Sequence, residues 1–296
     1  MRRILRGLIV LAVIAAGVAW VLSAPKTLPA EEFAGVTGDA ARGEAVFWAG
    51  GCASCHAAPG SGAEAKLVLA GGQKFPSPFG TFLAPNISSD PSAGIGAWSV
   101  PEFGNAVLRG VSPNGAHYFP AFPYTSYNKA SVQDIVDLKA FMDVLPADAT
   151  PSQPHEVGFP FNIRRSVGLW KLLFLNDEWQ LQDAPSDQLE RGRYLVEALG
   201  HCTECHTARN GLGGLERAAW LAGAPNPDGK GRVPNITPGA LDWVKVDIAA
   251  YLSTGFTPEY DSAGGHMALV VESLAKLPEE DVAAIAAYLT VIPALP

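Results

Sequence analysis

Two five-residue stretches constrain this chain of 296 residues more than any other feature. They occupy positions 52–56 and 202–206, and each has the pattern Cys-x-x-Cys-His. Two thiols at this spacing can add across the two vinyl groups of one porphyrin, and the adjacent imidazole then lies beneath the iron as its proximal ligand. The pattern therefore predicts two covalently bound haem c groups. Their attachment and proximal-ligand residues are expected to be Cys52, Cys55 and His56 in the first stretch and Cys202, Cys205 and His206 in the second.

Four cysteines have other uses in proteins. They form disulfides, all-thiolate zinc sites or thioredoxin-like redox pairs. Zinc ribbons place their Cys-x-x-Cys pairs within about twenty residues of each other, much closer than the two pairs here. The two patterns also use all 4 cysteines of the chain and leave none over, which favours haem attachment.

Composition agrees with a chain wrapped around large prosthetic groups. Charged residues make up only 17%, whereas there are 31 glycines and 24 prolines. We expect short helices joined by long, turn-rich loops. The net charge is −8, and the first thirty residues carry only cations, so the rest is more acidic still. Such a surface repels nucleic acid and suits partners with basic docking patches.

The N-terminus combines a basic segment, 1–6, with an uncharged apolar segment, 7–22. This order is typical of a signal peptide or of an N-terminal anchor. With its neighbours the apolar segment reaches the roughly twenty residues that a bilayer requires, and cleavage after Ala24 would place a proline at the following position. We expect an uncleaved transmembrane helix with its arginines on the cytoplasmic side. The haem domains would then face the periplasm of a bacterial inner membrane; a removed signal peptide is the alternative.

An internal repeat relates the two halves of the chain. The matching landmarks are Arg42-Gly43 and Arg191-Gly192, Pro85-Asn86 and Pro234-Asn235, Trp98 and Trp243, and Gly110 and Gly255. Asp39 and Ser186 are plausible caps for the first helix of each copy, and Ser131 with Asp134 resembles a capping box. Gly43 and Gly192 would let each first helix cross a last helix beneath Phe141 or Tyr288.

A first helix, a haem motif, a middle helix, a ligand loop and a last helix together are typical of a class I cytochrome c fold. The repeat therefore predicts an all-α protein with two tandem class I domains behind the N-terminal transmembrane helix. The expected parts are 1–30 for the anchor and tether, 38–146 for the first domain, 147–185 for a linker, and 186–296 for the second domain. Within the linker, the apolar segment 167–175 predicts a short helix packed between the domains. Arg164 and Arg165 could pair with haem propionates or lie in solvent.

The sixth iron ligand differs between the copies. Met267 lies twelve residues after Gly255 and is the expected distal ligand of the second haem, in a loop before the last helix. The equivalent residue of the first copy is Phe122, which cannot ligate iron. His117 is the best substitute, although a structural role for it is equally consistent with the sequence, and Met142 is expected to be a packing residue. Bis-histidine ligation would lower the potential of the first haem, whereas an open site would bind small ligands.

The chain resembles the cytochrome c subunits of membrane-bound bacterial dehydrogenases that oxidise alcohol, gluconate, sorbitol or fructose, and of related molybdenum hydroxylases. The resemblance covers nearly everything from residue 38 onward and rests on these stretches: 71–81, 85–91, 94–99, 119–124, 159–164, 200–207 and 213–214. It implies electron relay from a catalytic partner to quinone or a soluble cytochrome. Many relatives have three haem domains whereas this chain has two, which puts direct quinone reduction in doubt. Several relatives have a C-terminal anchor, and many have Met at the position of Phe122, although variants with Phe there resemble this chain too.

The leading hypothesis is a membrane-tethered periplasmic dihaem cytochrome. It would relay electrons between a dehydrogenase or a respiratory or photosynthetic complex and a downstream acceptor. Expected partners are a dehydrogenase catalytic subunit, a quinol-oxidising complex, a soluble cytochrome or a terminal oxidase. The sequence shows no nucleophile–base pair and no nucleotide loop, so the chain itself is not expected to be an enzyme. The alternatives are a dihaem oxidoreductase with catalysis or ligand binding at the first haem, and a ligand sensor.

Overall fold

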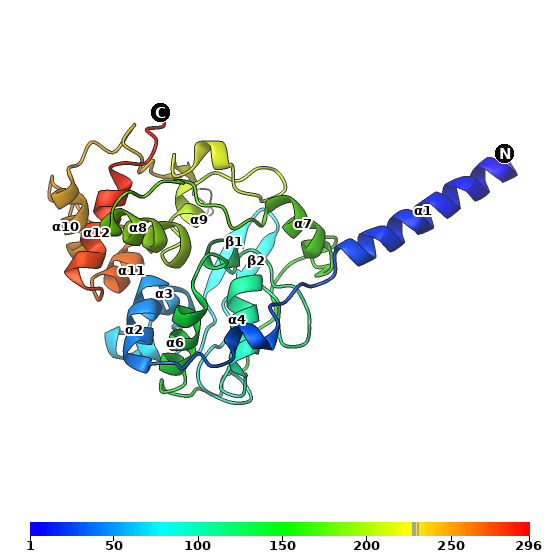
Figure 1. The fold of residues 1–296 in the computed structure, drawn as a ribbon, viewed down its shortest axis with the longest axis horizontal. Coiled ribbons are helices and arrows are strands. Elements are labelled where there is room, and N and C mark those ends of the chain that lie inside the picture. The colour runs from blue at the N-terminus through cyan, green and yellow to red at the C-terminus, as the bar shows by residue number, and fades with distance from the viewer. Residues whose placement is uncertain (227–228, 230) are drawn as a thin grey trace.

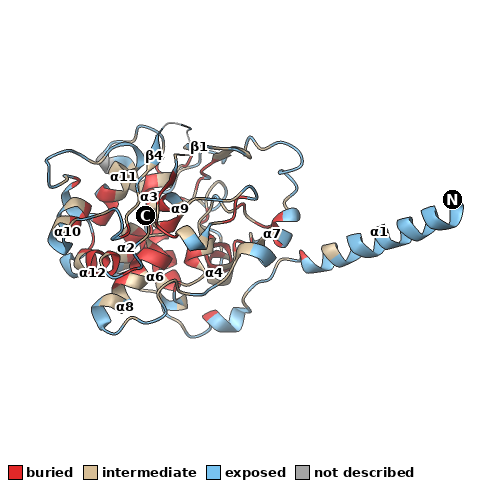
Figure 2. Ribbon diagram, turned by 90° about the horizontal axis from the view of Figure 1, so that it is seen from above, coloured by how far each residue is buried: buried red, intermediate tan, exposed pale blue. Residues whose placement is uncertain are grey.

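One long helix precedes a body of short helices and loops in the computed structural model, which describes residues 1–226, 229 and 231–296 (Figure 1). The long helix is α1 (Arg2–Leu22), and it projects away from the body. Its side chains are exposed along almost its whole length (Figure 2). It is the one helix among the described residues that is long and apolar enough to cross a bilayer.

The body repeats a similar order of elements. The first half contains the helices α2 (Ala40–Ala49), α3 (Cys52–His56), α4 (Val100–Arg109), α5 (Tyr124–Tyr127) and α6 (Val132–Met142), with short 3-10 turns at Ala30–Phe33 and Ala63–Leu67. The second half contains α8 (Asp187–Tyr194), which continues into a π-helical turn at Leu195–Leu199, then α9 (Thr203–His206), a 3-10 turn at Arg217–Ala219, α10 (Lys245–Thr254), α11 (Gly265–Leu274) and α12 (Glu279–Leu289). Between the halves lies α7 (Ser166–Phe174), close to the expected helix.

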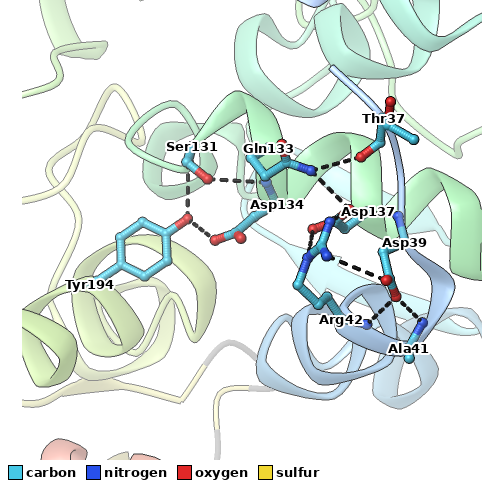
Figure 3. Close-up of polar contacts among 9 residues, drawn as sticks. All are labelled: Thr37, Asp39, Ala41, Arg42, Ser131, Gln133, Asp134, Asp137 and Tyr194. Carbon is cyan, nitrogen blue, oxygen red and sulfur yellow. Dashed lines mark hydrogen bonds and ion pairs between the residues drawn. The ribbon is translucent and has the colours of Figure 1, made fainter. Parts of the chain in front are cut away.

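Helix ends follow the local sequence signals. The Asp39 carboxylate accepts from the first backbone N–H groups of α2, and the Ser186 hydroxyl accepts from the N–H of Leu189, so both expected caps are confirmed. Ser131 caps α6 by accepting from the Asp134 N–H. In a full capping box the Ser131 N–H would donate to the Asp134 side chain. Here the Ser131 N–H donates instead to the Tyr194 hydroxyl at 2.9 Å (Figure 3).

The first and last helices of each half cross at a glycine. A Cβ on Gly43 would lie 2.0 Å from the carbonyl oxygen of Asp137 in α6, and one on Gly192 would lie 2.1 Å from that of Ala284 in α12. The predicted close crossings are therefore confirmed. Beside the first crossing the Arg42 guanidinium donates to the Asp137 carboxylate at 2.8 Å (Figure 3). Arg191 makes the equivalent ion pair with Asp281 in the second half.

The fold is mostly helical but not purely so. Two short antiparallel hairpins, which the sequence did not predict, follow the haem motifs: β1 (Lys74–Ser77) with β2 (Gly80–Leu83), and β3 (Ala224–Pro225) with β4 (Arg232–Val233). Thr81 of β2 also pairs with Glu156, so the start of the expected linker wraps around the first half. Helix α7 touches both halves, because Lys171 donates to the carbonyl of Gly110 and Trp170 donates to that of Leu212.

Candidate haem sites

Each Cys-x-x-Cys-His stretch forms a single helical turn that ends in a histidine, and the Nδ1 atom of this histidine contacts a backbone carbonyl. His56 Nδ1 lies 2.9 Å from the carbonyl oxygen of Pro85, and His206 Nδ1 lies 2.8 Å from that of Pro234. A carbonyl acceptor at Nδ1 fixes the tautomer with its proton on that nitrogen and leaves Nε2 as the metal-binding atom. Burial lowers the pKa of both imidazoles, although the carbonyl contacts oppose this effect. Both rings are therefore kept in the neutral form that ligates a metal.

The loops that carry these two carbonyls are built by asparagine. Asn86 accepts from the Ser88 N–H at 2.8 Å and donates to the carbonyls of Asp148 and Thr150. Asn235 repeats the arrangement, accepting from Thr237 and donating to the carbonyl of Leu295 near the C-terminus. The repeated Pro-Asn pairs thus fix the segment that orients the histidine of each Cys-x-x-Cys-His stretch.

All four thiols are free, so the chain uses none of them in a disulfide. Burial raises the pKa of Cys52, Cys55 and Cys202 to about 12. The described residues hold no group of three or more His, Cys, Asp or Glu side chains arranged for a metal ion. Two free thiols beside an imidazole with an available Nε2 fit covalent haem at each site.

The expected distal residues lie in different settings. Met267 is half-buried in the first turn of α11, so the prediction that it lies in a loop was wrong. Phe122 lies in the loop before α5, where its ring contacts the rings of Tyr118, Tyr124 and Tyr127. Met142 is buried in the core, as expected for a packing residue.

His117 contacts a residue near the N-terminus of the chain. The side chain is buried, and its Nε2 lies 2.9 Å from the carbonyl oxygen of Ser23, at the base of α1. This contact favours the structural role that the sequence left open over ligation through Nε2. Arg164 donates to the His117 carbonyl and stacks on Phe119, so it is held by the protein rather than free in solvent. Its pairing with a haem propionate stays a prediction.

The two Cys-x-x-Cys-His stretches meet at the interface between the halves. The Ser54 hydroxyl donates to the carbonyl of Leu269 in α11 at 3.0 Å. At the same position of the second stretch, the Glu204 carboxylate accepts from Thr125 of α5 at 2.6 Å. Each half therefore packs one of its helices, α11 or α5, against the Cys-x-x-Cys-His stretch of the other half. The sequence did not reveal this reciprocal packing.

A further contact joins the residues just before the two stretches. The carbonyl of Gly50, just before the first stretch, accepts from the Tyr127 hydroxyl at 2.9 Å. The same carbonyl lies 3.2 Å from His201 Nε2, just before the second stretch. The two haem attachment sites are thus neighbours within one body.

Two histidine turns of this kind, held by proline carbonyls and flanked by free thiols, define a c-type cytochrome with two haem sites. The chain belongs to the dihaem c-type cytochromes. The family model for cytochrome c matches residues 40–146. The chain is also 54% identical over 295 residues to a protein of Cereibacter sphaeroides described as "Diheme cytochrome c-type", and the match covers 100% of both chains.

Two further relatives are parts of dehydrogenases. The chain is 38% identical to the fructose dehydrogenase cytochrome subunit of Gluconobacter japonicus, over 86% of this chain and 52% of that subunit. It is 34% identical to the gluconate 2-dehydrogenase cytochrome c subunit of Pantoea cypripedii, over 84% and 58%. The chain thus spans little more than half the length of these subunits. It carries two covalently bound haem c groups, and its function is electron transfer rather than catalysis.

Proposed function

We propose that this protein is a membrane-tethered periplasmic cytochrome, built of two tandem class I cytochrome c domains, that relays electrons from a dehydrogenase to a downstream acceptor. The observation that carries the proposal is the reciprocal packing of the two haem motifs. It places both attachment sites in one body, with Ser54 held by α11 and Glu204 held by α5. Relay between two centres needs such a fixed arrangement, whereas two independent carriers would not.

The chain prepares the two sites differently. Each haem iron, when bound, supplies a one-electron carrier, and the chain tunes it through its axial ligands. His56 and His206 are the proposed proximal ligands, held in the same way by proline carbonyls. Met267 is the proposed distal ligand of the second haem only, because Phe122 stands at the equivalent position. We therefore expect two different midpoint potentials, with methionine raising that of the second haem.

The base of α1 supports an anchor that is retained. Ser23 is only 2% exposed, although it directly follows a helix exposed to the surroundings. Its hydroxyl accepts from Arg165 Nε at 2.9 Å, its carbonyl contacts His117, and the close approach of the chain at Gly168 leaves no room for a Cβ there. Cleavage after Ser23 or Ala24 would remove Ser23 together with α1, and the body would lose the contacts that Arg165 and His117 make with it. The folded body is thus built around the end of α1, as a permanent anchor requires.

A catalytic partner follows from the relatives. The fructose and gluconate dehydrogenase subunits are named as cytochrome components of dehydrogenases, so we propose a dehydrogenase catalytic subunit as the electron donor. A quinol-oxidising complex is a second possible donor, and a soluble cytochrome or a terminal oxidase is the proposed acceptor. The acidic body suits acceptors with basic docking surfaces.

The proposal is tested on full-length protein purified from bacterial membranes. Intact mass should show two haems and residues 1–24 still attached, and a redox titration should show two one-electron steps. Electron paramagnetic resonance of the oxidised protein should give low-spin signals from both haems, without rapid carbon monoxide binding after reduction. A high-spin first haem that binds carbon monoxide would argue for ligand chemistry there, and a mature chain without residues 1–23 would contradict the anchor.

A further inference from the structure

A second apolar surface lies beside the base of α1. Large apolar side chains are exposed throughout the segment 159–173, which includes most of α7. These are Phe159 (82% exposed), Phe161, Ile163, Leu169, Leu172 and Leu173 (69% exposed). Leu212 joins them, because its carbonyl accepts from the Trp170 indole at 2.9 Å and its own side chain is exposed. Single exposed apolar residues are common, but such a concentration marks an interaction surface.

This surface is continuous with the proposed anchor. Arg165, in the middle of the segment, stacks on the Trp20 ring of α1 at 4.3 Å and donates to the Trp20 carbonyl at 2.6 Å. Figure 1 shows α7 at the junction where α1 leaves the body. A helix that crosses a bilayer brings whatever adjoins its end to the membrane surface. The segment 159–173 is therefore positioned at the level of the lipid headgroups.

The charge of the segment differs from that of the rest of the body. It contains three cations, Arg164, Arg165 and Lys171, and no acidic residue, whereas the whole chain has a net charge of −8. Each cation also contacts the protein: Arg164 at the His117 carbonyl, Arg165 at Ser23 and Lys171 at the Gly110 carbonyl. An apolar segment without acidic residues avoids repulsion by anionic headgroups and is typical of the membrane interface. An aromatic residue such as Trp20 at the end of a spanning helix is typical of the same depth.

We propose that the surface formed by residues 159–173 and Leu212 inserts into the periplasmic face of the membrane as a second attachment site. This inference rests on the proposed anchor at α1. Two attachments hold the haem-bearing body at one orientation to the bilayer, whereas a single tether would leave it free to rotate. Lipid is the favoured occupant over a protein because the surface adjoins α1 and contains no acidic residue that anionic headgroups would repel.

The test uses full-length, haem-loaded protein in vesicles of phosphatidylethanolamine and phosphatidylglycerol that contain a phospholipid with a photoreactive diazirine in its acyl chain. After illumination, peptide mapping should find lipid adducts in both 1–22 and 159–173. The double variant Leu172→Gln/Leu173→Gln should lower the adducts in 159–173 several-fold. A matched control is Val244→Gln/Val246→Gln, which changes two exposed apolar residues at the start of α10, at the far end of the body in Figure 1.

The outcomes separate this inference from the proposal on which it rests. Adducts in 1–22 without any in 159–173 would overturn the second attachment and leave the anchor standing. No adducts in 1–22 would overturn the anchor itself. If 159–173 stays unlabelled while the Leu172→Gln/Leu173→Gln variant loses binding to a purified dehydrogenase catalytic subunit, the surface serves a protein and the inference is wrong.

Discussion

The crossing of α2 over α6 permits a quantitative prediction for Gly43→Ala. The new Cβ would lie 2.0 Å from the Asp137 carbonyl oxygen and 2.9 Å from Phe141 Cβ. Because one of these atoms belongs to the backbone, no side-chain rotation relieves the overlap, and the helices must separate by about 1 Å to restore normal contact. Such overpacking costs about 3 kcal/mol at the upper end of its usual range. Alanine recovers about 1 kcal/mol of helix propensity over glycine, which leaves a net loss of about 2 kcal/mol.

The assay is urea unfolding of the haem-loaded protein, followed by tryptophan fluorescence and by haem absorbance. Gly43→Ala should lower the free energy of unfolding of the first half by about 2 kcal/mol, because of the overlap at the crossing. Gly192→Ala should do the same in the second half, where the overlap with the Ala284 carbonyl is equally close. The control is Gly62→Ala, since a Cβ there meets nothing within 4 Å and its φ of −68° suits alanine. If Gly43→Ala and Gly62→Ala unfold alike, the crossing is not as close as the structure shows.

Three further predictions concern ligation, acid stability and the anchor. Met267→Ala should lower one midpoint potential in spectroelectrochemistry while Met142→Ala leaves both in place; a lowered potential in neither variant would refute ligation by Met267. Burial would raise the pKa of the Asp137 carboxyl, but hydrogen bonds, foremost from Arg42, hold that pKa below its usual range. The stability from this carboxylate is therefore present above pH ~4 and is lost as the pH falls through its lowered pKa. Asp137→Asn should flatten this acid limb in unfolding measured against pH, and an unchanged limb would contradict the assignment. Arg165→Ala should make the chain near Ser23 more susceptible to limited proteolysis, whereas unchanged cleavage would show that Arg165 does not hold the base of α1.

The sequence predicted the features that depend on local chemistry. The two Cys-x-x-Cys-His stretches predict haem attachment because this attachment depends on the spacing of residues within one helical turn. The caps at Asp39 and Ser186 could be predicted for the same reason, because a cap accepts hydrogen bonds from residues within three positions of it. The close helix crossings could also be predicted, because the repeat has a glycine at the same position of each first helix.

Features that the sequence missed or left open depend on distant partners. Met267 lies in a helix, not a loop, because the segment 265–274 packs as α11 against the first half of the body. The hairpins β1–β2 and β3–β4 are too short to leave a clear alternating pattern in the sequence. The sequence leaves open whether His117 ligates a haem or has a structural role, because its contact with Ser23 joins residues 94 positions apart.

The sequence by itself determined that this chain binds two haem c groups, and it predicts which residues hold them, because haem attachment is encoded within short spans. The tertiary structure alone decided how the halves are combined. The contact between Ser54 and Leu269 joins residues 215 positions apart, and that between Thr125 and Glu204 joins residues 79 apart. Such pairs form only when the whole chain has packed, and no local pattern in either segment specifies the other.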